Sequence, residues 1–207
     1  MLDTSNLSSS AIPTAVWKGG PMTTRTSEPL TAEFLDLISS VRRAVGDGAD
    51  SAVTARRVGE ALSERLSAGL PVPDHLRRHD PDHYTQHIAH VEPGGVFSIV
   101  VLVWLPGQAT AIHDHVSWCV TGVLEGQETE EVYELRETDG RTCLVRTGES
   151  VNVSGAVSVL DPPGDIHRVH NSCSELAVSL HIYGADIHKL GSSIRRTYDL
   201  PVVERAG

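Results

Sequence analysis

Apolar residues recur at helical spacing in two segments near the start of the chain. In the first segment, Phe34, Leu37, Ile38 and Val41 follow one another at steps of three and one, as on one face of an α-helix. A Thr-Ser pair before this segment and a Gly-Asp-Gly run after it are typical helix ends. The second segment starts near residue 51 and ends at a glycine followed by prolines. We therefore expect amphipathic helices at about residues 26–70, packed on a core.

The spacing changes after residue 83. From there to residue 183, short runs rich in Val, Ile and Leu alternate with turn sequences that contain Gly, Pro, Asp or Glu. Two of the runs, at residues 142–146 and 150–153, are separated by a Thr-Gly-Glu turn sequence. Many short strands separated by turns favour an antiparallel sandwich or barrel over a parallel sheet. The predicted fold class is mainly β, with N-terminal α-helices followed by a β-barrel.

These patterns also predict how the chain is organised. Residues 1–25 are rich in Ser, Thr, Pro and Gly, a composition that predicts a flexible leader. Residues 26–207 are expected to form a single domain, because the length suits one well-formed core. Its barrel is predicted to span about residues 84–187, and the chain after Ile187 is interpreted as a mixed basic tail.

Charge and composition narrow the possible function classes. The 207 residues include 17 Lys and Arg against 27 Asp and Glu, a net charge of −10. No basic face is therefore expected for a phosphate backbone, which excludes nucleic acid as a partner. The absence of a long apolar run or an export signal predicts a cytoplasmic protein without a membrane partner. The oligomeric state stays open.

Histidine is unusually frequent, with 11 residues, whereas aromatic residues make up only 4% of the chain. On a strand, His113 and His115 would point to the same face, about 7 Å apart, because side chains alternate along a strand. His167 follows a Pro-Pro-Gly turn and is the candidate for a third ligand. Imidazoles suit Fe, Zn, Cu or Ni, and three protein ligands leave positions open for a substrate. The pattern thus predicts a catalytic metal site.

The spacing around these histidines resembles the two sequence motifs of the cupin superfamily. The residues that match these motifs are Gly107, His113, His115, Gly126, Pro162, Gly164, His167 and Asn171. Cys119 replaces the glutamate that is a fourth ligand in many cupins. With the stretch Ser179-Leu180-His181-Ile182-Tyr183, this substitution looks like the cysteine dioxygenase family of thiol dioxygenases. The resemblance covers about residues 84–183 and implies a cupin β-barrel, a jelly-roll-like fold.

The resemblance implies one Fe(II) per chain, held by His113, His115 and His167. The implied activity is that of a thiol dioxygenase, which adds both atoms of O2 to the thiol of a small mercapto-carboxylate and forms a sulfinate. The expected partners are therefore O2 and either 3-mercaptopropionate or L-cysteine. Because imidazole ligands are neutral, the ion keeps its charge of +2, which favours binding of an anionic thiolate.

Four further residues receive roles from the resemblance. Ser179, His181 and Tyr183 alternate by two, so they share one face of a strand. They resemble a family relay in which hydrogen bonds orient the tyrosine hydroxyl beside the metal. In some members, a cysteine at the position of Cys119 forms a thioether cross-link to that tyrosine. We therefore treat Cys119 and Tyr183 as a candidate cross-linked pair.

The residues that would select the substrate give a mixed picture. Gln86 stands where cysteine-selective relatives carry a carboxylate-binding arginine, and resembles relatives that prefer 3-mercaptopropionate. Cys119 is more familiar among cysteine-selective relatives. Arg168, Arg195 and Arg196 are candidates for the missing positive charge, although each suits an ordinary surface position equally well. Trp118 is either a wall of the substrate pocket or part of the apolar core.

Two other function classes fit the same histidines. A non-catalytic metal-binding cupin would hold Zn or Ni and sense a small ligand, in which case the Ser179–His181–Tyr183 relay would have no catalytic task. A zinc hydrolase with three histidine ligands would need a general base, for which the sequence shows no clear motif.

Overall fold

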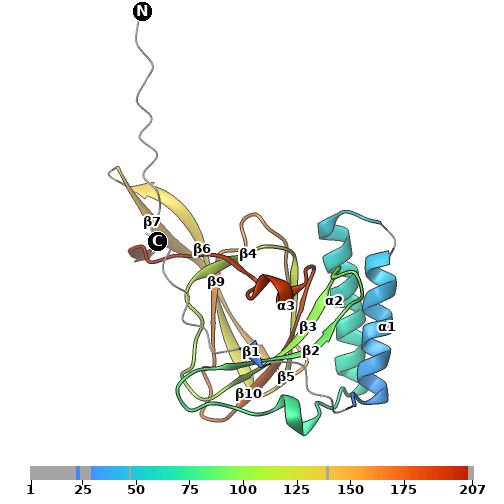
Figure 1. Cartoon of the computed structure of the whole chain (residues 1–207). Coiled ribbons are helices and arrows are strands. Elements are labelled where there is room, and N and C mark those ends of the chain that lie inside the picture. Colours follow the sequence, from blue (N-terminus) through green and yellow to red (C-terminus); the bar gives the residue numbers. More distant parts are fainter. Residues whose placement is uncertain (1–21, 24–28, 47, 139, 205–207) are drawn as a thin grey trace, which may run out of the picture.

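The computed structural model describes residues 22–23, 29–46, 48–138 and 140–204. The predicted leader, residues 1–25, lies outside this part of the chain except for β1 (Met22–Thr23), which pairs in parallel with β2 (Thr85–Val91). A pair of helices lies side by side against one wall of a two-sheet β-barrel (Figure 1). None of the described helices is both long and apolar enough to cross a membrane.

Helix α1 (Ala32–Gly46) begins later than the predicted start near residue 26. The Thr31 hydroxyl accepts a hydrogen bond from the Phe34 amide at 3.3 Å, which satisfies one of the free amides at the helix start. The predicted Thr-Ser cap falls in residues 24–28, outside the described residues.

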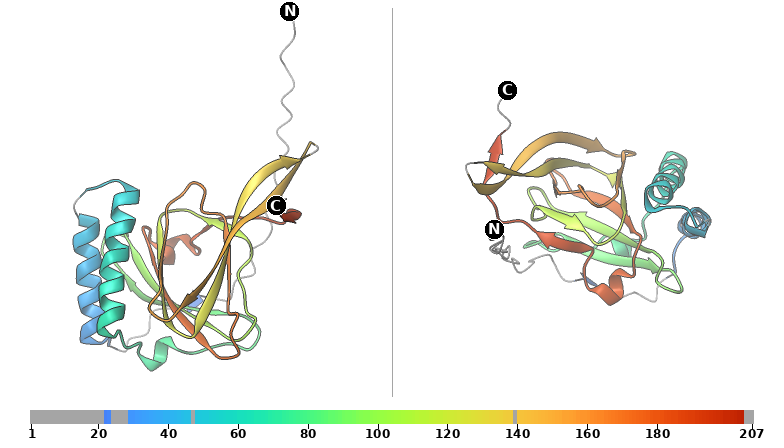
Figure 2. Two further views of the ribbon diagram at one scale, coloured as in Figure 1. Left: turned by 180° about the vertical axis from the view of Figure 1, so that it is seen from behind. Right: turned by 90° about the horizontal axis from the view of Figure 1, so that it is seen from above.

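Helix α2 (Ser51–Ala68) has the predicted bounds. The Asp50 carboxylate accepts a hydrogen bond from the Val53 amide at 2.8 Å, as expected for an N-cap residue. Gly69 follows the last turn with a φ of +85°, a backbone conformation that favours glycine. The view from above shows both helices outside the barrel, against one sheet (Figure 2).

Two sheets of six strands form the barrel. The first has the order β1-β2-β3-β10-β5-β8, and the second has the order β11-β4-β9-β6-β7-β12. Besides β1 and β2, the strands are β3 (Ser98–Trp104), β4 (His113–His115), β5 (Cys119–Glu125), β6 (Gln127–Thr138), β7 (Arg141–Val153), β8 (Val157–Leu160), β9 (His167–His170), β10 (Ala177–Tyr183), β11 (Ile194–Thr197) and β12 (Val202–Glu204). Short helices η1 (Asp74–Leu76) and α3 (Ile187–Leu190) lie in connections. The predicted fold class, a mainly β barrel preceded by N-terminal helices, is confirmed.

The strand boundaries differ from the prediction in two places. The runs at residues 142–146 and 150–153 belong to one long strand, β7, whose pairing with β6 shifts between Val132 and Tyr133. The Thr-Gly-Glu sequence is therefore absorbed as a bulge, because an extra residue can be accommodated without ending the ladder. The segment after residue 187 is also more than a tail, since β11 pairs with β4 and β12 pairs with β7.

Side-chain alternation in β3 and β10 separates two apolar cores. On β3, Ile99 and Val101 face the helices, whereas Val100 and Leu102 face the barrel interior. Where α2 crosses β5, a Cβ on Gly122 would come within 2.8 Å of a Leu62 methyl group, so glycine permits close packing there.

Trp118 lies in the core between the helices and the first sheet, together with Phe34 and Leu62. Cys119, the next residue, belongs to the interior core, as the alternation of side chains along a strand requires. Trp118 therefore packs in the apolar core and is not a wall of the predicted substrate pocket.

Candidate metal centre

The three predicted metal ligands meet inside the barrel. His113 and His115 come from β4, and His167 from β9 is the register partner of His113. One ring nitrogen from each histidine lies within 4.8 Å of the others, and the Nε2 atoms of His113 and His167 are 3.2 Å apart. All three residues are buried. The structure thus brings together three imidazoles that can share one ion.

Each histidine is oriented by a hydrogen bond at its other ring nitrogen. His113 Nδ1 lies 2.9 Å from the Ala111 carbonyl oxygen, His115 Nδ1 lies 3.0 Å from Asp165 Oδ2, and His167 Nδ1 lies 2.7 Å from Glu130 Oε1. Since a carbonyl or carboxylate oxygen accepts, each Nδ1 carries the proton and donates. The Nε2 lone pairs are then available to a metal.

The charges of these groups suit a dication. Burial lowers the pKa of His113 well below its usual value, with His167 and His115 adding to the effect. Burial opposes ionisation of Glu130, but hydrogen bonds led by His167 lower its pKa overall. Asp165 behaves in the same way through His115. Neutral imidazoles backed by buried carboxylates provide the donor set and compensating charge expected for Fe(II) or another intermediate divalent ion.

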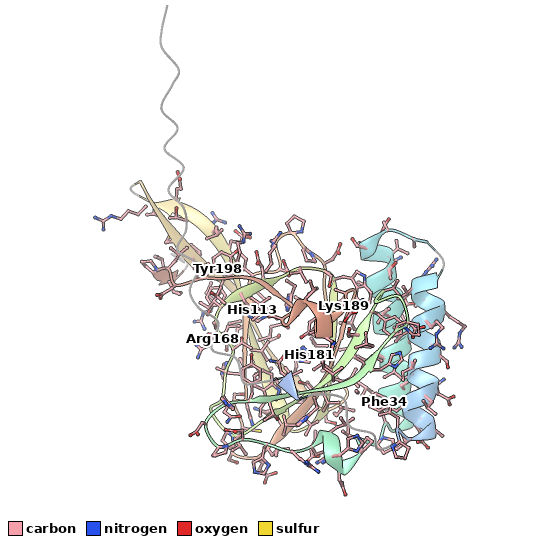
Figure 3. The ribbon with its side chains drawn as sticks, viewed as in Figure 1. Phe34, His113, Arg168, His181, Lys189 and Tyr198 are labelled. Carbon is pink, nitrogen blue, oxygen red and sulfur yellow. The ribbon has the colours of Figure 1, made fainter. Side chains whose placement is uncertain are left out.

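The three side chains of the predicted relay are hydrogen-bonded to one another along β10. Tyr183 Oη lies 3.1 Å from His181 Nδ1, and His181 Nε2 lies 3.1 Å from Ser179 Oγ. Burial raises the pKa of Tyr183 well above its usual value, with Cys119 adding to the effect, so the phenol keeps its proton. Figure 3 shows His113 and His181 within the barrel, whereas Phe34 lies at the helices.

A cavity opens over the histidines. It is lined by Tyr84, Gln86, Leu102, Thr110, His113, His115, His167, Val169, His181, Tyr183, Ser192, Ser193 and Ile194. Gln86 reaches it from β2, where its register partner is Leu102. Within the described part of the chain, no lysine, arginine, aspartate or glutamate lines this cavity.

The structure places the candidate arginines elsewhere. Arg168 follows an inward-facing ligand, so its own side chain turns outward, and its Nη1 lies 3.5 Å from Glu131 Oε2. Arg195 and Arg196 both bind the buried carboxylate of Asp114, at 2.6 and 2.7 Å. Arg168 therefore lies outside the lining of the cavity, and the two tail arginines anchor β11 to β4 through Asp114.

Sequence reasoning missed several residues around the site. Glu130 and Asp165 orient two ligands, and Ser193 lies within hydrogen-bonding reach of Tyr183. Glu128 also points into the barrel, because it alternates with Glu130 along β6. Only Asp165 carried a signal in the sequence, since it lies within the second histidine motif.

Comparisons with known proteins agree with this geometry. A model of the family described as cysteine dioxygenase type I matches residues 72–192. Cysteine dioxygenase type 1 of Danio rerio is 30% identical over 120 residues, which cover 57% of this chain and 59% of that protein. The Homo sapiens protein of the same name is 30% identical over 106 residues, which cover 50% of this chain and 52% of its own length. The aligned region therefore spans little more than half the length of these relatives.

Among solved structures, a cupin 2 conserved barrel domain protein from Salinispora arenicola CNS-205 has 22% identity and a TM-score of 0.39. The match covers 55% of this chain and 84% of that protein.

Proposed function

Because the chain belongs to the cysteine dioxygenase type I family, we propose that it is a thiol dioxygenase that converts a small mercapto-carboxylate into its sulfinate. The observation that carries this proposal is the buried cluster of His113, His115 and His167 in one cavity with the Tyr183 phenol. The three histidines would hold one Fe(II) per chain. Thiolate and O2 combine into the sulfinate without any other source of electrons, so the reaction needs no second redox cofactor.

The protein's own groups prepare the site for this reaction. Fe(II) held by the three histidines would bind the thiolate and activate O2. Tyr183 keeps its proton and presents its hydroxyl to the cavity, where it can donate a hydrogen bond to developing negative charge. The apolar side chains of Leu102, Val169 and Ile194 line the same cavity and exclude water from the reacting groups.

The lining of the cavity favours 3-mercaptopropionate over L-cysteine. Gln86, with 7% of its surface exposed, offers a neutral amide to the substrate carboxylate, and the hydroxyl of Ser192 lies in the same lining. The described part of the lining contains no carboxylate that would receive the ammonium of cysteine. A substrate without an amino group therefore avoids burying an unpaired charge.

The main alternative is a metal-binding module that senses a small ligand without turnover. It leaves the connected Tyr183–His181–Ser179 hydrogen bonds without a task, as does a zinc hydrolase with three histidine ligands. Metal analysis separates the classes, since the proposed function requires activity that depends on iron.

The test measures oxygen uptake by the iron-loaded protein with 3-mercaptopropionate and L-cysteine in parallel, and identifies the sulfinate. We expect uptake with 3-mercaptopropionate, and with L-cysteine either none or uptake at a lower kcat/KM. The His167→Ala variant should lose iron and activity together, whereas His170→Ala on the same strand, outside the cavity lining, should keep both. Stoichiometric zinc without iron-dependent uptake would contradict the proposal.

A further inference from the structure

The relay continues beyond Ser179 into the barrel interior. The Trp104 indole donates to Ser179 Oγ at 3.1 Å, and the Glu128 carboxyl group lies next to both Ser179 and Trp104. Glu128 is only 3% exposed, and its Oε1 has no hydrogen-bond partner. A buried carboxyl group thus lies beside the Ser179 end of a chain of hydrogen bonds that leads to Tyr183.

In this chain of hydrogen bonds, the donors must all point the same way, either towards Tyr183 or away from it. Burial, together with His115 and His167, lowers the pKa of His181 to about 3, so its ring is neutral. A neutral imidazole has one N–H donor and one acceptor nitrogen. Since both ring nitrogens of His181 are hydrogen-bonded, to Tyr183 and to Ser179, one contact must donate and the other must accept.

Two proton arrangements satisfy the same heavy atoms. If Glu128 is a neutral acid, it donates to Ser179, Ser179 donates to His181 Nε2, and His181 Nδ1 donates to Tyr183. The phenol proton then points into the cavity. If Glu128 is a carboxylate, it accepts from Ser179, His181 Nε2 donates to Ser179, and Tyr183 donates to His181. The Tyr183 hydroxyl then offers the cavity only a lone pair.

We propose that Glu128 is a positioning residue whose protonation sets the direction of this hydrogen-bond chain, so that Tyr183 is a donor to the cavity only while Glu128 is neutral. Both arrangements leave Ser179 with two acceptor contacts and one donor contact. The reversal therefore needs proton shifts but no movement of the backbone. The effect on turnover rests on the proposed dioxygenase function, whereas the direction of the chain does not.

The surroundings of Glu128 favour the neutral acid. A carboxylate would leave a charged oxygen buried without a partner, which costs more than an unpaired carbonyl oxygen. Burial, reinforced by the charge of Glu130, raises the pKa of Glu128 to about 7, although the contacts with Ser179 and Trp104 oppose the shift. Among the described residues, Glu130 on the same strand and His181 on β10 are titratable groups near Glu128, while β3 contributes Trp104 and β7 contributes its register partner Asn152.

The sign of the pH dependence follows from this arrangement. Below the pKa of Glu128 the acid is neutral and Tyr183 donates to the cavity. Above that pKa the carboxylate reverses the chain. For a group that titrates near pH 7, the neutral fraction falls about tenfold from pH 6 to pH 8, and turnover should fall by the same factor.

Infrared spectroscopy of the purified protein tests the protonation directly and needs no turnover. We expect a carboxylic-acid band that disappears between about pH 6 and pH 8 and is missing from Glu128→Gln. Ultraviolet Raman spectra, taken as a difference against Tyr183→Phe, should show the phenol changing its hydrogen-bonding state over the same range. Glu131→Gln, on the same strand but facing Arg146 and Arg168, should keep both transitions.

Activity provides the second measurement. The loss of kcat/KM towards high pH should be present in the wild type and in Glu131→Gln, and absent from Glu128→Gln. The proposal would be overturned if Glu128 were ionised throughout this pH range, or if the Tyr183 signal stayed unchanged while Glu128 titrates. Both results come from the wild type, so they count even if Glu128→Gln fails to fold. If the spectra change as expected but no thiol is oxidised, the proposed function is wrong while the assignment of Glu128 stands.

Discussion

Cys119 lies directly opposite Tyr183 in the antiparallel pairing of β5 with β10. Both side chains belong to the same apolar cluster in the barrel interior. Burial raises the pKa of Cys119 well above its usual value, so the thiol keeps its proton in these surroundings. The pair is therefore positioned for the thioether cross-link implied by the family resemblance.

We predict that turnover with iron and O2 joins Cys119 Sγ to the Tyr183 ring. The new C–S bond replaces one S–H and one C–H bond, and O2 takes up the two hydrogens. Mass spectrometry should find a chain lighter by two hydrogen atoms and one peptide containing both residues. Cys119→Ala should keep its unmodified mass, while Cys143→Ser should cross-link normally. Unmodified Cys119 and Tyr183 after many turnovers would refute the cross-link.

Removing the Glu130 carboxylate should weaken metal binding. In the wild type, Glu130 Oε1 lies 2.7 Å from His167 Nδ1, and Glu130→Gln removes the negative charge from this contact. Hydrogen-bond partners of metal-binding histidines contribute about 10- to 100-fold to metal affinity or activity. Iron affinity should fall within that range. The matched change Glu131→Gln lies on the outward face of the same strand and should leave affinity unchanged. Equal affinities of the two variants would argue against this orienting role.

The identity of residue 86 should control the choice of substrate. Gln86→Arg introduces the arginine that the family resemblance assigns to cysteine-selective relatives, where it binds the substrate carboxylate through two charge-assisted hydrogen bonds. We expect the ratio of kcat/KM for L-cysteine to that for 3-mercaptopropionate to rise at least tenfold, equivalent to about 1.4 kcal/mol. Gln127→Arg adds the same charge outside the cavity lining and should not change the ratio. An unchanged ratio in both variants would show that residue 86 does not select the substrate.

Asp114 should stabilise the β4–β11 edge that carries two of the metal ligands. Its carboxylate accepts hydrogen bonds from Arg195, Arg196 and the Tyr198 hydroxyl. Asp114→Asn should lower the free energy of unfolding by about 1–3 kcal/mol, because hydrogen bonds to a buried charge weaken. Denaturant unfolding would measure this loss. As a control, Asp36→Asn removes an exposed ion pair with Arg65 and should change the free energy of unfolding by less than about 1 kcal/mol. Similar losses in Asp114→Asn and Asp36→Asn would argue against the anchoring role of Asp114.

Strand periodicity predicts much of the site. The two-residue spacing of His113 and His115, and of Ser179, His181 and Tyr183, places each set on one face of a strand. The same rule applies to Arg168, which follows an inward-facing ligand and therefore points outward. Arg168 is therefore adjacent to the ligand His167 in sequence, yet it does not line the cavity.

Other parts of the site depend on contacts between residues distant in sequence. Arg195 meets Asp114 across 81 positions of the chain, and no local pattern in a basic tail indicates that pairing. Glu128 and Glu130 resemble a solvated strand face by composition, yet they point into the barrel. Their role follows from their buried partners, Ser179 and His167, which only the folded structure identifies.

Turnover under isotopically labelled oxygen tests the central claim most directly. The iron-loaded protein would react with 3-mercaptopropionate, and in parallel with L-cysteine, under ¹⁸O2. Mass spectrometry would count the labelled oxygen atoms in the sulfinate, with His167→Ala as the control. We predict that both sulfinate oxygens carry the label and that the variant forms no product. No sulfinate from 3-mercaptopropionate or L-cysteine, or product with oxygen derived from water, would contradict the assignment of a thiol dioxygenase.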